Sequence, residues 1–171
     1  MIAARALVVC VLLAGCSIDR NNSRFDRFDR VIEVGNWMYA LNVENQNEQA
    51  GRKTGAPADK YLKATLYISN SKTKHSLLYS ASRDNADYEE KYKYLSFGSR
   101  EDLCLKWKDQ TIYPIGYVFE PSNGLGSNDK LVYKFRLSDD LYRKLKDDDG
   151  NVAYWYTDKL VGIGKICFKQ Q

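Results

Sequence analysis

The only histidine in the chain, His75, is the one side chain suited to act as a general base near neutral pH. In nucleophilic catalysis it would need an orienting carboxylate and a nucleophile within hydrogen-bond reach. Three serines lie near it in the sequence, but nothing around them resembles a nucleophile elbow: Ser69, Ser71 and Ser76. The lysine-rich sequence around His75 instead indicates an exposed turn.

Two groups of acidic residues could do chemistry of other kinds. Glu89 and Glu90 are adjacent, whereas glycoside hydrolysis needs two carboxyl groups facing each other across a cleft. The sequence 147–151, Asp-Asp-Asp-Gly-Asn, partly matches a calcium-binding loop. Aligning Gly150 with the glycine of that motif places Leu145 and Tyr156 where two oxygen ligands belong. We therefore expect no catalytic residues, no metal site and no cofactor, with weak calcium binding as the alternative.

Aromatic residues are the strongest candidates for contacts with a partner. The chain has thirteen tyrosines, six phenylalanines and three tryptophans. Six of them stand out, three among Glu and Lys residues and three in a row: Tyr88, Tyr92, Tyr94, Tyr154, Trp155 and Tyr156. Alternation along a strand must send some of the last three outward, and exposed Tyr and Trp suit protein or glycan contacts. The alternative is that all six fill a β core.

The N-terminal residues have the composition of a targeting signal. Arg5 precedes an apolar stretch, 6–14, that is too short for the roughly 20 residues needed to span a bilayer. It ends in Leu13-Ala14-Gly15-Cys16, which resembles the lipobox of bacterial lipoproteins. The resemblance implies a signal peptide over 1–15 and acyl chains, palmitate among them, on Cys16, which would anchor a tether over 16–30. Because Ser17 follows the cysteine, it also implies the outer membrane, with the protein facing the periplasm. An ordinary secretory signal is the alternative.

Two further cysteines, Cys104 and Cys167, would enter an oxidising compartment. Each alternates with apolar neighbours, so each is expected on the solvent side of its strand. An even pair predicts a disulfide between two strands lying side by side, outside the core. Two thiols without a bond are the alternative.

The elements that would position these residues are mostly strands. Alternation is clearest over 61–69 and 130–137. Other strands are expected over 31–34, 37–43, 76–81, 91–97, 103–108, 111–120, 151–157 and 161–169. Pro114 places the strand 111–120 at an edge or a bulge. One helix is expected over 138–146, capped by Ser138.

This pattern predicts one mainly β domain over 31–171, an antiparallel β-sandwich of which the immunoglobulin fold is one form. A small barrel is the alternative. The formal net charge of +4 is too small and too evenly spread to indicate nucleic-acid binding.

Together these features predict a non-catalytic, lipid-anchored envelope protein that binds a protein partner or supports an envelope assembly. One alternative is an immunity or inhibitor lipoprotein that blocks a toxin or hydrolase in the periplasm. Glycan binding and a cell-wall hydrolase using His75, Glu89 or Glu90 are others.

Overall fold

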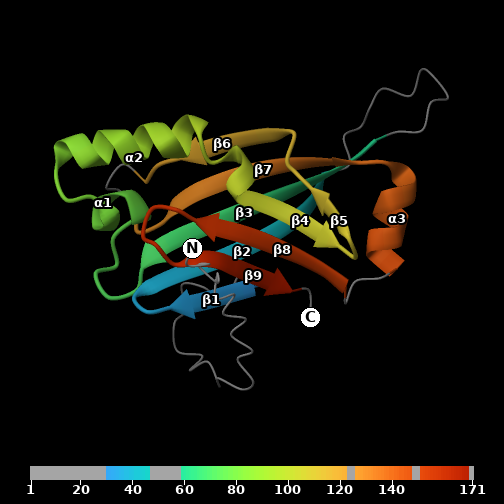
Figure 1. Cartoon of the computed structure of the whole chain (residues 1–171), viewed down its shortest axis with the longest axis horizontal. Helices are drawn as coiled ribbons and strands as arrows, with labels where there is room; N and C mark the ends of the chain where they lie inside the picture. The colour runs from blue at the N-terminus through green and yellow to red at the C-terminus, as the bar shows by residue number, and fades with distance from the viewer. Residues whose placement is uncertain (1–29, 47–58, 123–125, 148–150, 170–171) are drawn as a thin grey trace, which may run out of the picture.

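Strands that bury every second side chain build two antiparallel sheets, packed face to face (Figure 1). The computed structural model describes residues 30–46, 59–122, 126–147 and 151–169. Cys16 and the ranges 1–15 and 16–29 lie outside these described residues. The predicted mainly β, antiparallel sandwich is confirmed.

The first sheet has five strands in the order β1-β2-β3-β7-β6. Their bounds are Arg30–Val34 (β1), Trp37–Gln46 (β2), Lys60–Asn70 (β3), Asp129–Leu137 (β7) and Gly116–Glu120 (β6). The second sheet has the order β5-β4-β8-β9. Its strands are Gln110–Ile112 (β5), Leu103–Trp107 (β4), Val152–Asp158 (β8) and Gly164–Lys169 (β9). An immunoglobulin domain places its third strand in the opposite sheet, whereas β1, β2 and β3 are consecutive neighbours here.

The core lies between the two sheets, and aromatic rings from both meet there. The ring centroids of Tyr39 on β2 and Tyr156 on β8 are 6.1 Å apart. Phe135 on β7 meets Tyr154 on β8 edge to face at 6.2 Å. All four side chains are buried. The alternation of β7 and β8 in the sequence therefore reports a true inward face.

The helix α3 (Asp139–Asp147) confirms the predicted helix 138–146, with bounds one residue later. The side chain of Ser138 accepts a hydrogen bond from the backbone N–H of Leu141 at 3.2 Å, which is the expected cap. Arg143 and Lys144 form ion pairs with Asp139 and Asp140, four residues earlier, both at 2.6 Å.

The predicted strands 76–81 and 91–97 are wrong, because these residues form the helices α1 (Leu77–Ala81) and α2 (Asn85–Phe97). A carboxylate caps α2: Asp84 accepts from the backbone N–H of Asp87 at 2.9 Å. The Asp87 carboxylate also pairs with Lys91, one turn later, at 2.7 Å. The cap thus gives a hydrogen-bond acceptor to a backbone N–H of the first turn of α2, which has no acceptor within the helix. A 3₁₀ turn, Arg100–Asp102, then leads into β4.

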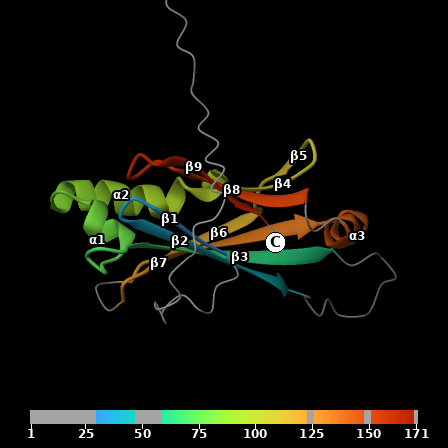
Figure 2. The ribbon, with the colours of Figure 1, turned by 90° about the horizontal axis from the view of Figure 1, so that it is seen from below.

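The expected strand 111–120 is two strands in different sheets, β5 and β6. Pro114 lies between them and has no N–H to donate to a sheet. Each of the two strands lies at an edge of its sheet, as the proline predicted. Figure 2 shows the two layers from another direction, with α1 and α2 at one end and α3 at the other.

Candidate functional site

The structure separates the six predicted contact residues into three groups. Tyr154 and Tyr156 are buried in the core, at 2% and 1% exposure. Tyr94 is half-buried and belongs to a polar network described below. Tyr92 is exposed on α2, Tyr88 of the same helix is half-buried and packs against the core, and Trp155 lies on the outer face of the second sheet. Partner contact therefore stays a prediction for Tyr88, Tyr92 and Trp155. The alternative, that the aromatic residues fill the core, applies to Tyr154 and Tyr156.

Trp155 occupies the centre of the outer face of the β4-β8-β9 strands. Register pairs it with Cys104 on β4 and with Cys167 on β9, so these three side chains form one row across three strands. All three are half-buried. Within the described part of the chain, no hydrogen bond occupies the indole N–H of Trp155.

The predicted Cys104–Cys167 disulfide does not form, and this corrects the expectation from the sequence. The cysteines do share the outer face, as their alternation indicated. Their strands, however, are not neighbours, because β8 runs between them. Two strand spacings of about 4.8 Å separate their Cα atoms by roughly 10 Å, beyond the roughly 7 Å limit for a disulfide. Burial raises the pKa of the Cys104 thiol, and the charges of Lys106 and Lys165 oppose that effect.

Three exposed lysines surround Trp155 on the same outer face. The strand register places Lys106 and Lys169 opposite Ala153, two residues before Trp155 on β8. It places Lys165 opposite Thr157, two residues after Trp155. Each is thus a diagonal neighbour of the indole at roughly 7–8 Å. The Lys106 ammonium lies 5.3 Å from the Trp155 ring centroid, over its face.

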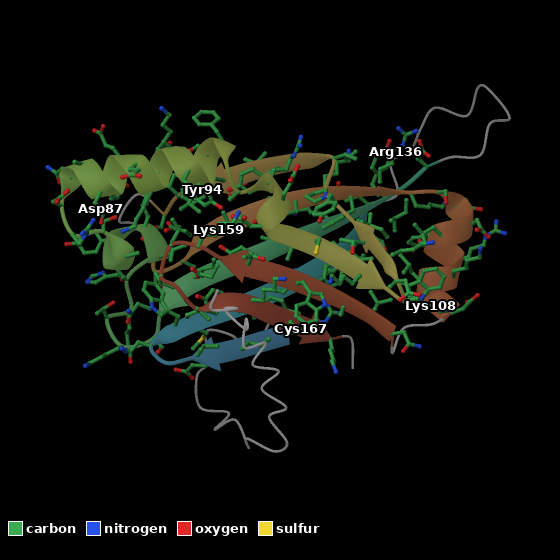
Figure 3. All side chains as sticks on the ribbon, in the orientation of Figure 1. Asp87, Tyr94, Lys108, Arg136, Lys159 and Cys167 are labelled. Carbon is green, nitrogen blue, oxygen red and sulfur yellow. The ribbon has the colours of Figure 1, made fainter. Side chains whose placement is uncertain are left out.

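These six side chains form what we call the basic face: Cys104, Lys106, Trp155, Lys165, Cys167 and Lys169 (Cys167 is labelled in Figure 3). Its three lysines form no ion pair with any described residue. No Asp or Glu occupies an outward position of β4, β8 or β9. The basic face therefore carries a local charge of +3.

The outer face of the first sheet carries cations too: three are paired with acids, and a fourth, Lys134, lies 4.3 Å from the centroid of the Tyr61 ring. Lys63 pairs with Glu44 at 3.3 Å, and Lys130 pairs with Glu120 at 3.7 Å. A third pair joins Arg136 to Asp59 at 2.6 Å (Arg136 is labelled in Figure 3). The two outer faces therefore differ in how many of their cations are paired with acids among the described residues, and this difference distinguishes the basic face.

A second surface feature lies on α2, where a groove of about 430 Å³ is lined by four residues. We call these residues the α2 groove: Tyr88, Glu89, Tyr92 and Lys93. The two tyrosine rings stack, with centroids 6.5 Å apart and an interplanar angle of 16°. Tyr92 also meets Phe119 of β6 edge to face at 5.8 Å. The contact with Phe119 therefore fixes the position of the Tyr92 ring in the groove.

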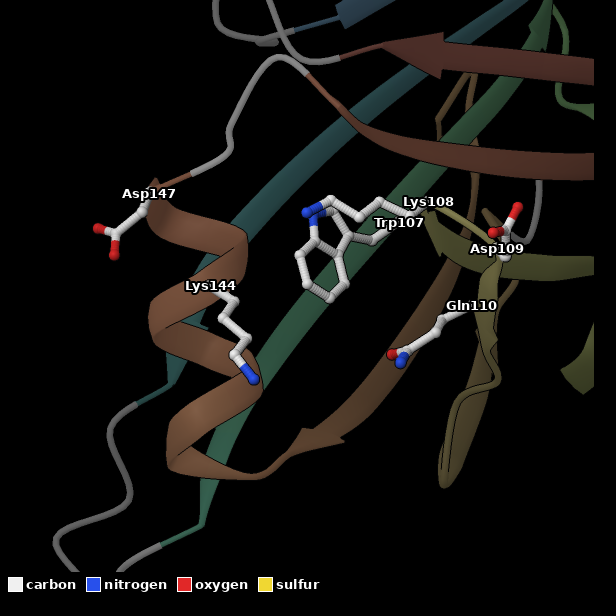
Figure 4. A pocket seen from close by; sticks show the side chains of 6 residues that line it. All are labelled: Trp107, Lys108, Asp109, Gln110, Lys144 and Asp147. Carbon is white, nitrogen blue, oxygen red and sulfur yellow. The ribbon is translucent and has the colours of Figure 1, made fainter.

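A larger open hollow of about 650 Å³ lies between α3 and the turn that joins β4 to β5 (Figure 4). Lys108 of that turn lies over the Trp107 ring, 4.5 Å from its centroid. Lys144 of α3 also lines the hollow, and its ammonium is paired with Asp140. Trp107 is buried, and the other five side chains that line the hollow are polar or charged.

Tyr94 belongs to a polar network that ties α2 to the second sheet. Its hydroxyl donates to the buried carboxylate of Asp102, and the Lys159 ammonium lies 2.6 Å from the same carboxylate. Tyr94 lies on α2 and Lys159 directly follows β8 (both are labelled in Figure 3). Burial raises the pKa of Asp102, while the hydrogen bonds from Lys159 and Tyr94 lower it. A second pair, Tyr39 to Asp158 at 2.6 Å, is buried nearby. This arrangement holds the last turns of α2 against the core.

The residues considered for catalysis do not form one site. His75 lies in the exposed turn before α1, where its ring meets that of Tyr79 at 4.9 Å. Glu89 lines the α2 groove, and Glu90 is exposed beside it on the same helix. Of the partial calcium motif, 148–150 lies outside the described residues. Within the part of the chain that is described, no cluster of three His, Cys, Asp or Glu side chains could hold a metal ion.

The comparisons with known proteins give no relative. No family model, no curated protein and no solved structure matches the chain. None of the helices in the described ranges combines the length and apolar character needed to cross a bilayer.

Proposed function

We propose that the chain is a non-catalytic binding module of the bacterial envelope, lipid-anchored at Cys16, that docks an acidic protein partner on its basic face. The observation that carries this proposal is the contrast between the two outer sheet faces. The first sheet pairs three of its outward cations with acids, whereas the second leaves three lysines around a tryptophan without an ion-pair partner in the described residues.

The chemistry of the basic face favours a protein surface as its ligand. A sheet face is broad, and half-buried Trp155 offers an apolar ring and an N–H donor at its centre, as residues dominating protein interfaces do. The surrounding lysines would steer an acidic partner and fix its orientation. An anchor and a tether behind the domain would keep this face near other envelope proteins.

Capture from an envelope extract tests the proposal, with the full chain as bait. The informative variant is Lys106→Glu/Lys165→Glu/Lys169→Glu, which reverses the charge of the basic face. The matched control is Lys72→Glu/Lys74→Glu/Lys146→Glu, since these lysines are also exposed and the net charge changes equally. We expect the wild type and the control to capture the same acidic protein and the informative variant to lose it.

Salt dependence provides the second readout. Capture should weaken by about tenfold or more between 0.05 and 0.5 M NaCl, because exposed charge pairs are screened. A partner retained by the informative variant, or held equally at both salt concentrations, would contradict the proposal. Capture of an enzyme whose activity then falls would favour the inhibitor alternative on the same face.

A further inference from the structure

We propose that the α2 groove is a separate binding site for a neutral oligosaccharide. It lies on a helix, whereas the basic face belongs to strands, and it shares no residue with that face. It is an open surface hollow of about 430 Å³.

The rings of the α2 groove supply one half of sugar recognition. A sugar ring has faces of C–H groups, which carry slight positive charge, and an aromatic ring has a negative face. Tyr92 is 41% exposed although it packs on Phe119, so part of its ring is open to solvent while its position is fixed. Tyr88 stacks beside it and extends the same aromatic surface.

The charged residues of the α2 groove supply the other half. Glu89 and Lys93 lie one helical turn apart, at a spacing where such residues commonly pair. They do not pair with each other, and no described residue forms an ion pair with either one. A carboxylate that only accepts hydrogen bonds and an ammonium that only donates them thus border the aromatic surface.

The ligand that satisfies all four residues is polar at its edge, apolar on its face and neutral. Sugar hydroxyls both donate to Glu89 and accept from Lys93. The opposite charges of these two residues cancel, which disfavours a strongly charged glycan. The remaining polar atoms of the groove are the tyrosine hydroxyls, and neither forms a hydrogen bond within the described residues.

Titration followed by two-dimensional nuclear magnetic resonance tests this inference. The ¹⁵N-labelled full chain is titrated with cellotetraose, maltotetraose and chitotetraose, and with tetragalacturonate as the charged comparison. We expect saturable shifts of the Tyr88, Glu89, Tyr92 and Lys93 amides with at least one neutral sugar. Tyr92→Ala should weaken that binding about fivefold or more, because it removes the stacking ring.

Further variants separate ligand binding from helix stability. Glu89→Gln/Lys93→Gln changes only exposed side chains, and we expect it to weaken sugar binding several-fold with an otherwise unchanged spectrum. Tyr79→Ala, an exposed tyrosine of α1, is the matched control and should bind like the wild type. Trp155→Ala should also bind sugar normally, so this test is independent of the proposed protein partner.

Three outcomes would overturn the inference. One is the absence of saturable shifts with any neutral sugar up to about 20 mM. Another is wild-type affinity in the Glu89→Gln/Lys93→Gln variant. The third is a preference for tetragalacturonate, since a charged ligand contradicts the balanced pair of charges.

Discussion

Two aspartates show how position alone sets the behaviour of a carboxyl group. Asp102 is buried, and burial raises its pKa above the ordinary value of 3.8. Asp87 lies at the start of α2, where hydrogen bonds from Lys91 and from the Arg83 backbone hold its pKa below the ordinary range. The two groups should therefore contribute to stability in opposite directions as pH changes.

The sign for each group follows from where its proton is held more tightly. Folded Asp102 keeps a proton between pH 3.8 and its raised pKa, so its contribution is present at low pH and is lost as pH rises through that raised pKa. Folded Asp87 loses its proton more easily, so its contribution is present at neutral pH and is lost on acidification.

Urea unfolding between pH 2 and pH 7 measures this difference. The loss of unfolding free energy caused by Asp102→Asn should be greatest at the lowest pH and shrink toward pH 7. The loss caused by Asp87→Asn should be greatest at pH 7 and shrink on acidification. The same pH trend for both variants would falsify the assignment of these two environments.

At the scale of the elements, the order of strands decides the fate of the two cysteines. Alternation within β4 and β9 correctly places Cys104 and Cys167 on one outer face. Alternation carries no information about which strand lies beside which, and β8 separates them. The predicted disulfide is therefore wrong because β8 pairs with both β4 and β9, and this pairing depends on contacts between residues distant in the chain.

This separation predicts that the folded protein retains two thiols at these positions. The mass of the intact protein measured without reductant should show no loss of 2 Da between Cys104 and Cys167. The Cys104→Ser/Cys167→Ser variant should lose less than about 1 kcal/mol of unfolding free energy, against about 4 kcal/mol for removing a disulfide. A peptide map containing the linked pair would contradict the strand order.

The helix α2 shows the opposite case, in which two local patterns in the sequence favour different elements. Tyr92 and Tyr94 alternate with lysines, and this predicted a strand over 91–97. The residues just before this segment supply an Asp cap, Asp84, and charged pairs four residues apart, which favour a helix. Most of its side chains are polar or tyrosine, so it lacks the apolar stripe that identifies an amphipathic helix.

At the scale of the whole molecule, the two-layer sandwich places neighbouring residues of one strand on opposite faces, one in the core and one on the surface. Tyr156 points into the core and meets Tyr39, whereas Trp155 belongs to the basic face. Tyr156→Ala should lower the unfolding free energy by about 3–5 kcal/mol, because it leaves a cavity between the sheets. Trp155→Ala should cost about 1 kcal/mol or less, because Trp155 lies on the outer face of its sheet, away from the core between the two layers.

Chemical denaturation of both variants compares the two faces directly. If Trp155→Ala destabilised the domain as much as Tyr156→Ala, Trp155 would be a structural residue, and its place at the centre of a docking face would be lost. Partner capture by the Trp155→Ala protein, once folded, then separates binding from stability.

The sequence by itself determined the mainly β class, the clearest strands and α3, because alternation, turn residues and helix caps act between near neighbours in the chain. It also identified Trp155 and the surface tyrosines as candidates. Only the tertiary structure decided which of six aromatic residues lie outside, because burial depends on what the opposite layer covers. The same holds for the three lysines of the basic face: that none of them pairs with an acid among the described residues follows from the pairing of β4, β8 and β9, which are distant in the chain.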